Sequence, residues 1–359
     1  AVTHGADGDA VAGDGIYTAY LPPYGCPAFQ AGDLIEYRVS AMAPEGTRIY
    51  PVTNKTGANS SDFSYFFKFG EDTQSDCAFP GEYFTVHMLM TTSNSIALTN
   101  DIAVTKAANV DCTFFADATI ITSDGEIFQS ASVRGRGGTS RNPNFGGYRV
   151  ELPPGGKVLG MKRFNLNHLN ALKQYIGMQT FGATCGKYAF ESHLSRVYLN
   201  GTLKLPSQGI YMLFEAFDDD MMSKRYSGAL GNRYLADGDW RNGYLQYLGE
   251  APTSYTNKYY IDINNPYTAW NEMRDLCRTL NQPVSSYPTV LTNRVNVREW
   301  ARHFATQTCL DNQEAGFGST TSVSGDEMRL YADQNTGQFD FYPWDFDTII
   351  SSGARLWTR

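Results

Sequence analysis

The feature that most constrains this chain is an alternating run near its C-terminus that ends in two carboxylates two positions apart. The run is Phe-Asp-Phe-Tyr-Pro-Trp-Asp-Phe-Asp, residues 339–347. In an extended strand residues i and i+2 point to the same side, so Asp345 and Asp347 are expected to converge. Two carboxylates among aromatic residues must be protonated, hydrogen-bonded or neutralised by a cation. Mg²⁺ takes one or two carboxylates and fills its other positions with phosphate and water. A solvated strand end gives the same pattern, so the motifs that precede the pair decide between the two.

Composition bounds the class of protein. The chain has 359 residues and a formal net charge of −8, which argues against nucleic acid as a partner. Its 23 Tyr and 21 Phe indicate an ordered globular chain. We find no apolar run of membrane-spanning length and no signal peptide at Ala1. Residues 1–14 resemble the end of a hairpin, so we expect the numbering to begin inside a longer precursor.

Cysteine usage favours an oxidising compartment. The six residues form no C-x-x-C pair, so zinc-ligand spacing is absent. An even count without metal spacing is typical of structural disulfides in a secreted protein. Cys26 and Cys77 are expected to pair, and the four later cysteines to form bridges among themselves, with pairings that spacing does not fix. The cysteines are Cys26, Cys77, Cys112, Cys185, Cys277 and Cys309. Sequons at Asn54, Asn59 and Asn200 fit a secreted eukaryotic protein.

The order of expected elements indicates two domains. Residues 1–100 are predicted to be all-β, with strands near 16–21, 34–39, 63–69 and 83–90, and to form a small immunoglobulin-like sandwich. From residue 101 the pattern changes to a β-rich lobe up to about 215 and a helical lobe over 216–359. Helices are predicted over 268–280 and 297–310, and Asn296 and Glu299 form a capping box for the second. The predicted fold class is α+β.

Three segments supply charged groups that suit a nucleotide. Residues 133–141 read as a strand entering a glycine-rich turn, and their Arg134 and Arg136 offer forked donors to phosphate. Lys162 lies on the next predicted strand, with Arg149 as an additional cation. Glu215 ends a strand that looks buried, over 209–215, and is also assigned to the nucleotide site. Each segment alone is more often an ordinary turn or a surface charge.

The terminal unit supplies the acidic groups. The helix over 297–310 leads into a loop that carries Asn312 and Glu314. A hairpin with strands at 328–331 and 338–344 follows and ends at Asp345 and Asp347. This order is that of a kinase C-terminal lobe, in which a loop carboxylate positions the acceptor hydroxyl, an amide helps to hold metal and a final Asp binds the cation.

These motifs make the chain similar to the CotH kinase family, the spore-coat-protein-H-like atypical kinases. The resemblance covers roughly residues 105–350 and rests on V-R-G-R-G at 133–137, L-G-M-K-R-F-N-L at 159–166, V-Y-L-N-G at 197–201, G-I-Y-M-L-F-E at 209–215 and L-Y-A-D…F-Y-P-W-D-F-D at 330–347. It implies a two-lobed, protein-kinase-like fold that uses ATP and Mg²⁺ or Mn²⁺ to phosphorylate Ser or Thr on secreted or coat proteins. The predicted sandwich resembles the β-domain found ahead of such domains in secreted members.

The resemblance also assigns roles by position. It makes Asp345 the metal-binding Asp and matches Asn312 to the family's Asn. Glu314 stands where many members place a catalytic Asp, and Gly146-Gly147 stand where many have a basic pair. The alternative function is an inactive relative that serves as an extracellular structural or adhesion protein. A third possibility is a site that transfers AMP. Hydrolase chemistry is disfavoured, since the chain has no G-x-S-x-G or H-E-x-x-H motif.

Overall fold

The computed structural model describes residue 29 and residues 34–37, 39–43, 46–50, 65–68, 83–138, 141–204, 209–236, 243–312 and 327–350. Several sequence predictions fall outside these ranges. They are the strand near 16–21, the sequons at Asn54 and Asn59, Cys26, Cys77 and the catalytic candidate Glu314.

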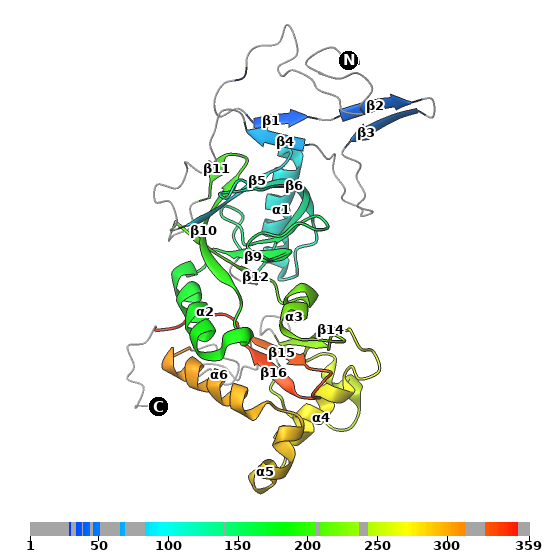
Figure 1. Cartoon of the computed structure of the whole chain (residues 1–359), viewed down its shortest axis with the longest axis vertical. Coiled ribbons are helices and arrows are strands. Elements are labelled where there is room, and N and C mark those ends of the chain that lie inside the picture. Colours follow the sequence, from blue (N-terminus) through cyan, green and yellow to red (C-terminus); the bar gives the residue numbers. More distant parts are fainter. Residues whose placement is uncertain are drawn as a thin grey trace.

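The N-terminal strands form two separate two-stranded sheets. Strand β1 (Leu34–Tyr37) pairs antiparallel with β4 (Tyr65–Lys68), and β2 (Val39–Ala43) pairs antiparallel with β3 (Gly46–Tyr50). Both lie at one end of the elongated molecule (Figure 1). An immunoglobulin-like sandwich packs two sheets of about seven strands in total. The described residues do not contain that arrangement, so the predicted sandwich is not confirmed.

The middle of the molecule is a sheet that closes on itself. Its strand order is β11-β10-β12-β9-β8-β7-β6-β5, and β10 also pairs in parallel with β5. Closure leaves few unpaired backbone groups at the edges, which stabilises a sheet. The strands are β5 (Phe84–Leu89), β6 (Ala116–Thr122), β7 (Ile127–Gly135), β8 (Tyr148–Glu151), β9 (Arg163–Asn167), β10 (Ser192–Leu199), β11 (Thr202–Leu203) and β12 (Tyr211–Glu215). We call this sheet the barrel.

Helix α1 (Thr92–Ala108) packs along the barrel and spans the domain boundary expected at about residue 100 (Figure 1). Thr91 caps the helix by accepting the backbone N–H of Asn94 at 3.1 Å. Leu98 and Ile102, one turn apart, lie in the same apolar core as the strands of the barrel. The prediction that residues up to 100 are all-β is therefore wrong from Thr92 onward. Strand β5, assigned to the sandwich from sequence, belongs to the barrel.

The C-terminal region combines helices with a second sheet. Its strand order is β14-β13-β15-β16, all antiparallel, and the predicted terminal hairpin is confirmed as β15 and β16. The strands are β13 (Arg233–Ala236), β14 (Tyr260–Asp262), β15 (Met328–Ala332) and β16 (Phe339–Tyr342). The helices are α2 (Ala171–Cys185), α3 (Asp219–Arg225), α4 (Asn271–Leu280), α5 (Tyr287–Val290) and α6 (Val297–Cys309), with short 3-10 turns at 186–188, 252–255, 284–286 and 291–293.

Helix α6 forms where predicted but buries a different face. The sequence pattern placed Val297, Ala301 and Ala305 toward the core, yet these residues are exposed. The buried stripe runs through Trp300, His303, Thr306 and Gln307. Polar residues occupy this stripe because their partners lie on neighbouring segments, which hydrophobicity alone cannot reveal. Helix α6 packs against α2 (Figure 1), and the Thr306 hydroxyl donates to that of Thr184 on α2 at 3.0 Å.

The predicted capping box of α6 is also absent. Asn296 occupies the N-cap position but makes no side-chain bond to the helix. Its Nδ2 donates instead to Asp340 Oδ1 at 3.2 Å and to the Tyr188 hydroxyl at 3.3 Å. The buried Asp340 thus orients the Asn296 amide, whose oxygen makes no cap bond to the helix.

The predicted disulfides of the later domain are not found. The four described cysteines, Cys112, Cys185, Cys277 and Cys309, are all free thiols. Within the described ranges we find no helix with the length and apolar character to cross a membrane. The fold combines helices with a barrel and an antiparallel second sheet, which agrees with the α+β prediction, while the two-lobed kinase arrangement stays a prediction.

Candidate functional site

A polar row crosses the face of the barrel opposite its apolar core. Arg134 on β7 pairs with Arg149 on β8, which pairs in turn with Asn165 on β9. Paired residues of antiparallel strands share a face. The sequence neighbours Val133 and Val150 lie in the core, so strand alternation turns both arginines the other way. Arg149 Nε donates to Asn165 Oδ1 at 3.2 Å. The row therefore offers two guanidinium groups and an amide on one surface.

Arg136, just after β7, stacks on two aromatic rings. Its guanidinium carbon lies 5.3 Å from the centroid of the Phe214 ring and 5.7 Å from that of the Trp344 ring. Phe214 pairs with Asn165 in the sheet, so its ring lies on the same face as the polar row. Aromatic faces attract a cation through their quadrupole. The two rings thus hold Arg136 between the barrel and the segment that carries the carboxylate pair.

Arg136 and Arg149 are buried beside other charged groups. The pKa of Arg149 is lowered to about 10, first by burial and then by the charges of Arg134 and Arg136. Burial also lowers the pKa of Arg136 to about 10; Asp345 opposes this shift, whereas Arg329 adds to it. Burial and repulsion between the arginines destabilise the charged forms of Arg136 and Arg149, yet both stay charged at neutral pH. An anion bound at this surface would relieve that repulsion, and phosphate matches the forked donors of Arg.

The two carboxylates meet through a turn and not through an extended strand. Strand β16 ends at Tyr342, and Asp345 has a φ of 41°, a left-handed conformation that is uncommon outside glycine. Asp345 Oδ1 accepts the backbone N–H of Asp347 at 3.2 Å, which is the bond of an Asx-turn. The expectation of an extended backbone here is therefore wrong. A local side-chain bond brings the two residues together.

Helix α2 holds this turn through Gln174. The side chain of Gln174 is almost fully buried, its Nε2 donates to Asp345 Oδ1, and its Oε1 accepts the backbone N–H of Phe346 at 2.9 Å. Gly177, one turn further along α2, lies against the Phe346 ring: a Cβ at Gly177 would be 2.3 Å from Cγ of that ring. The close approach of helix and turn needs a glycine at this position.

Asn312 braces the same turn from the other side. Its Nδ2 donates to the Asp345 carbonyl oxygen at 2.9 Å and to Gln307 Oε1 at 3.0 Å. Its Oδ1 accepts the hydroxyl of Thr348 at 3.0 Å. The sequence predicted a catalytic and metal-holding role for Asn312. The structure shows both ends of its amide engaged in fixing the backbone around Asp345.

The carboxylate pair has the chemistry of a site for a hard divalent cation. The pKa of Asp345 is raised to about 7, mainly by burial and then by the charge of Asp347. Oδ1 of Asp347 is buried and has no hydrogen-bond partner among the described residues. An unsatisfied buried carboxylate oxygen is costly, and a bound cation offsets that cost. Mg²⁺ and Mn²⁺ prefer oxygen ligands, so Asp345 and Asp347 fit such an ion.

The cationic and acidic groups share one small hollow. It encloses about 20 Å³, room for roughly one water molecule, and its walls include Arg136, Gln174 and Asp345. The remaining lining residues are Asn167, Met178, Phe214 and Trp344. The site therefore joins guanidinium donors to a carboxylate pair across the junction of the barrel and the C-terminal region.

Lys162 and Glu215 have other partners. Glu215 is buried, and its carboxylate pairs with Lys224, at 3.0 Å, and with Arg225, both on α3. Lys162 lies before β9, where its backbone N–H donates to Asp220 of α3 at 3.4 Å. The structure thus brings together Arg134, Arg136, Arg149, Asp345, Asp347 and Asn312. It associates Glu215 and Lys162 with α3 instead.

Sequence reasoning missed Gln174, Asn165 and Arg329. Arg329 lies on β15, far in sequence from the barrel arginines. Its guanidinium carbon lies 4.3 Å from the centroid of the Trp344 ring. A buried Gln in a glycine-containing segment has no local signal, because its partners are more than 170 residues away. Asn165 was detectable in principle, since its position in the strand alternates with the buried Phe164 and Leu166.

The comparisons with known proteins point to one family. The sequence model described as CotH kinase protein matches residues 133–356, which is more than half of the chain and includes every residue of the small hollow. A comparison with curated proteins found no match.

Proposed function

The chain belongs to the CotH kinase family, and from that premise we propose that it binds ATP with Mg²⁺ or Mn²⁺ and transfers the γ-phosphate to Ser or Thr of secreted or coat proteins. One observation carries the proposal. Arg136, which suits a phosphate, and Asp345, which suits a cation, line the same hollow. Phosphoryl transfer depends on positioning and on electrostatic stabilisation of the phosphates, and both require these two kinds of group together.

On the acidic side, Asp345 and Asp347 would hold the cation. When bound, such an ion would neutralise negative charge on the phosphates. Gln174 and Asn312 orient the turn, so their contribution is geometric. Because both amides already contact the turn in the protein alone, the carboxylates are held in place before any ligand binds.

On the cationic side, Arg136 and the row of Arg134 and Arg149 would bind phosphate oxygens. Removing any one of the three relieves part of their repulsion but also removes a donor. We expect the loss of a donor to dominate, because each guanidinium group offers forked donors that match phosphate. The catalytic role of Glu314 rests on the sequence pattern alone, as this residue lies outside the described ranges.

The test is transfer from ATP to the protein itself and to serine-rich acceptor peptides, followed by intact-mass analysis with Mg²⁺ or Mn²⁺ present. A phosphate-sized mass increase that is lost in Asp345→Ala supports the proposal. An AMP-sized increase would assign adenylyl transfer instead. No increase with either metal, together with unchanged stability on adding metal and ATP, would identify an inactive relative with a structural or adhesive role.

The location of the protein follows from weaker arguments. The predicted secretion rests on the sequons and on Cys26 and Cys77, because the four described cysteines are unpaired. We therefore propose secreted or coat proteins as acceptors mainly on the family resemblance. Counting thiols in the denatured, unreduced protein tests it: four free thiols fit a bridge between Cys26 and Cys77, whereas six contradict an oxidising compartment.

A further inference from the structure

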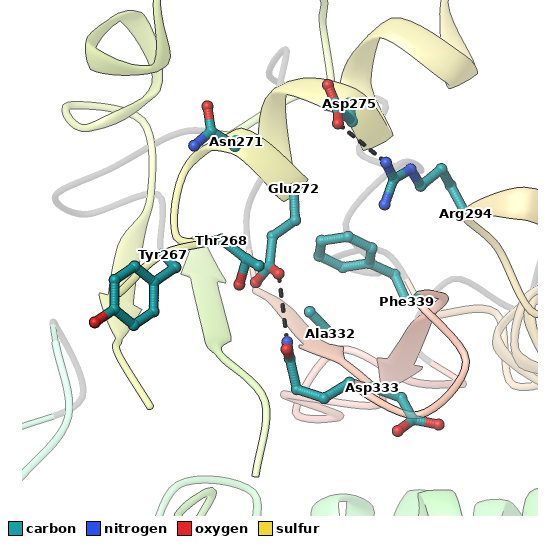
Figure 2. A pocket seen from close by; sticks show the side chains of 11 residues that line it. Tyr267, Thr268, Asn271, Glu272, Asp275, Arg294, Ala332, Asp333 and Phe339 are labelled. Atoms are coloured by element: carbon teal, nitrogen blue, oxygen red, sulfur yellow. Dashed lines mark hydrogen bonds and ion pairs between the residues drawn. The ribbon is translucent and has the colours of Figure 1, made fainter. Parts of the chain in front are cut away.

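A second, larger cavity lies at the far end of the β15–β16 hairpin. It encloses about 300 Å³, at the lower end of the range for ligand pockets. Figure 2 shows it between the first turn of α4 and the hairpin turn. It shares no residue with the hollow at Asp345. The lining residues used below are Tyr267, Glu272, Asp275, Arg294, Asp333 and Phe339.

Two buried carboxylates of this cavity have only neutral partners among the described residues. Glu272, 8 % exposed, accepts hydrogen bonds from the Asn232 amide at 2.8 Å and the Tyr234 hydroxyl at 2.9 Å. Gln334 adds a longer bond at 3.5 Å, drawn in Figure 2. Asp333, 9 % exposed, accepts only from Thr336 and Asn335 of the hairpin turn. Buried carboxylates are ordinarily paired with a cation.

The third carboxylate of the lining, Asp275, has its counterions. Arg294 donates to Asp275 Oδ2 at 3.0 Å, and Arg274 and Arg278 also pair with this carboxylate. Burial alone would raise the pKa of Asp275, but bonds from Arg274 and Arg278 outweigh that effect and lower it. The charge that lacks a counterion belongs to Glu272 and Asp333.

Aromatic residues give the cavity a further preference. The Phe339 ring projects between Glu272 and Arg294 in Figure 2, and Tyr267 stands at the rim with 90 % of its surface exposed. A large aromatic residue that is this exposed is free to cover a ligand. Aromatic faces bind ammonium and guanidinium groups and also pack against the alkyl stems that carry them.

We propose that this cavity binds a lysine or arginine side chain of the acceptor protein. The identity of the bound protein as the acceptor rests on the proposed kinase function; the preference for an organic cation does not. Phe339 and Asp345 are six positions apart in the chain, so the cavity lies at most roughly 20 Å from the carboxylate pair. An acceptor segment of about six residues spans that distance when extended.

A bare metal ion fits the cavity less well. A cavity of about 300 Å³ exceeds what an ion and its few ligands need, whereas an alkyl chain with a charged head matches it. An anionic ligand would meet two uncompensated carboxylates and be repelled.

The experiment measures peptide binding without nucleotide, so that an inactive enzyme leaves it intact. The probe is a fluorescent ten-residue peptide of alanine and glutamine with a serine and, six residues on, a lysine. Its control carries norleucine for lysine, which keeps the stem and removes the charge. The protein variants are Glu272→Gln, Tyr267→Ala and Glu126→Gln. Glu126 is an exposed carboxylate of the barrel, so its variant removes the same charge elsewhere.

We expect the lysine peptide to bind about tenfold more tightly than the norleucine peptide, and Glu272→Gln to remove that difference. Tyr267→Ala should weaken binding about threefold without affecting folding, since the side chain is exposed. Glu126→Gln should change nothing. Equal affinity for the two peptides, or unchanged affinity in both Glu272→Gln and Tyr267→Ala, would overturn the proposal. Equally tight binding of n-butylammonium alone would overturn the assignment to a protein side chain and favour a free amine.

Discussion

Gln174 on helix α2 makes two hydrogen bonds to the turn at Asp345: its amide nitrogen donates to the Asp345 carboxylate, and its amide oxygen accepts the N–H of the next residue, Phe346. One buried side chain thereby fixes both the carboxylate and the backbone that carries it. Because α2 packs on α6 as well, the orientation of Asp345 depends on how these two helices pack.

Replacing Gln174 tests how much these two hydrogen bonds contribute to metal binding. Gln174→Ala should weaken Mn²⁺ binding about tenfold, because Asp345 loses its orienting donor and the turn its second anchor. Titration of Mn²⁺ followed by electron paramagnetic resonance measures this directly. Gln179→Ala is the matched control: Gln179 lies on the same helix but bonds to Ser192. Equal Mn²⁺ affinity in both variants would show that Gln174 serves stability alone.

Two glycines of α2 should respond in opposite ways to the same substitution. A Cβ at Gly177 would overlap the Phe346 ring, whereas at Gly182 its nearest neighbour is 3.9 Å away. Gly177→Ala should lower the free energy of unfolding by about 1–3 kcal/mol. Gly182→Ala should raise it by about 0.5–1 kcal/mol, since alanine favours the helix. Urea unfolding followed by circular dichroism compares them, and a stabilising Gly177→Ala would contradict the close packing of α2 on the turn.

Because Arg136 stacks on two aromatic rings, a substitution that keeps these contacts can test its charge alone. Arg136→Met keeps a long side chain against Phe214 and Trp344 but loses the cation. We expect the Kd for ATP to rise about tenfold or more, as one charge-assisted donor to phosphate is lost. Calorimetry with Mn²⁺ and ATP measures it. Arg302→Met on the exposed side of α6, where Arg302 pairs only with Glu299 among the described residues, should leave the affinity unchanged.

The raised pKa of Asp345 makes stability depend on pH in the metal-free protein. Its folded-state pKa of about 7 lies above the ordinary value of 3.8. The folded state therefore holds a proton that the unfolded state has released, and the contribution of this group to stability, present below about pH 4, is lost as pH rises toward 7. Asp345→Asn abolishes this dependence. At pH 8 the variant should be more stable than the parent by about 1–3 kcal/mol, and at pH 4 the two should be equal.

Metal provides the control for that measurement. Mn²⁺ binds only the folded parent, so it should raise the melting temperature of the parent at pH 8 and leave Asp345→Asn unaffected. A parent whose stability does not fall between pH 4 and 8 relative to the variant would contradict the raised pKa of Asp345.

Sequence patterns located the elements of the C-terminal region better than the contacts of the site. The hairpin of β15 and β16 was predictable because its turn carries Asn335-Thr336-Gly337, a strong local signal. Helix α2 was not predicted: its two glycines weaken helical propensity, and its stability comes from packing on α6 and the barrel. The barrel was also beyond reach, since the parallel pairing of β5 with β10 joins strands about 110 residues apart.

The candidate site shows the same division. Arg134 and Arg136 were found from a glycine-rich turn, and Asp345 and Asp347 from their spacing. Lys162 was placed ahead of Arg149 by its motif, because the register that puts Arg149 beside Arg134 is not visible in a sequence. The Glu215 carboxylate pairs with Lys224 and Arg225 on α3, and its sequence position did not reveal these partners. Local motifs thus identified charged groups, and only the folded chain showed which of them meet.

At the start of α6, the contacts of the N-cap residue differ from those that the general rule for helix caps predicts. At an N-cap, Asp serves as well as Asn, so the sequence alone predicts that Asn296→Asp is harmless. In the structure Asn296 donates to Asp340 and Tyr188 instead, and burial already raises the pKa of Asp340. A carboxylate at position 296 would lose both donors and face Asp340.

We expect Asn296→Asp to lower the free energy of unfolding by about 1–3 kcal/mol at pH 8, and less at lower pH, where protonation of either carboxyl restores a donor. Thr91→Asp is the control, because Thr91 does cap α1 and Asp preserves that bond. Chemical unfolding of both variants across pH decides the matter: equal stabilities would mean that Asn296 acts as an ordinary cap.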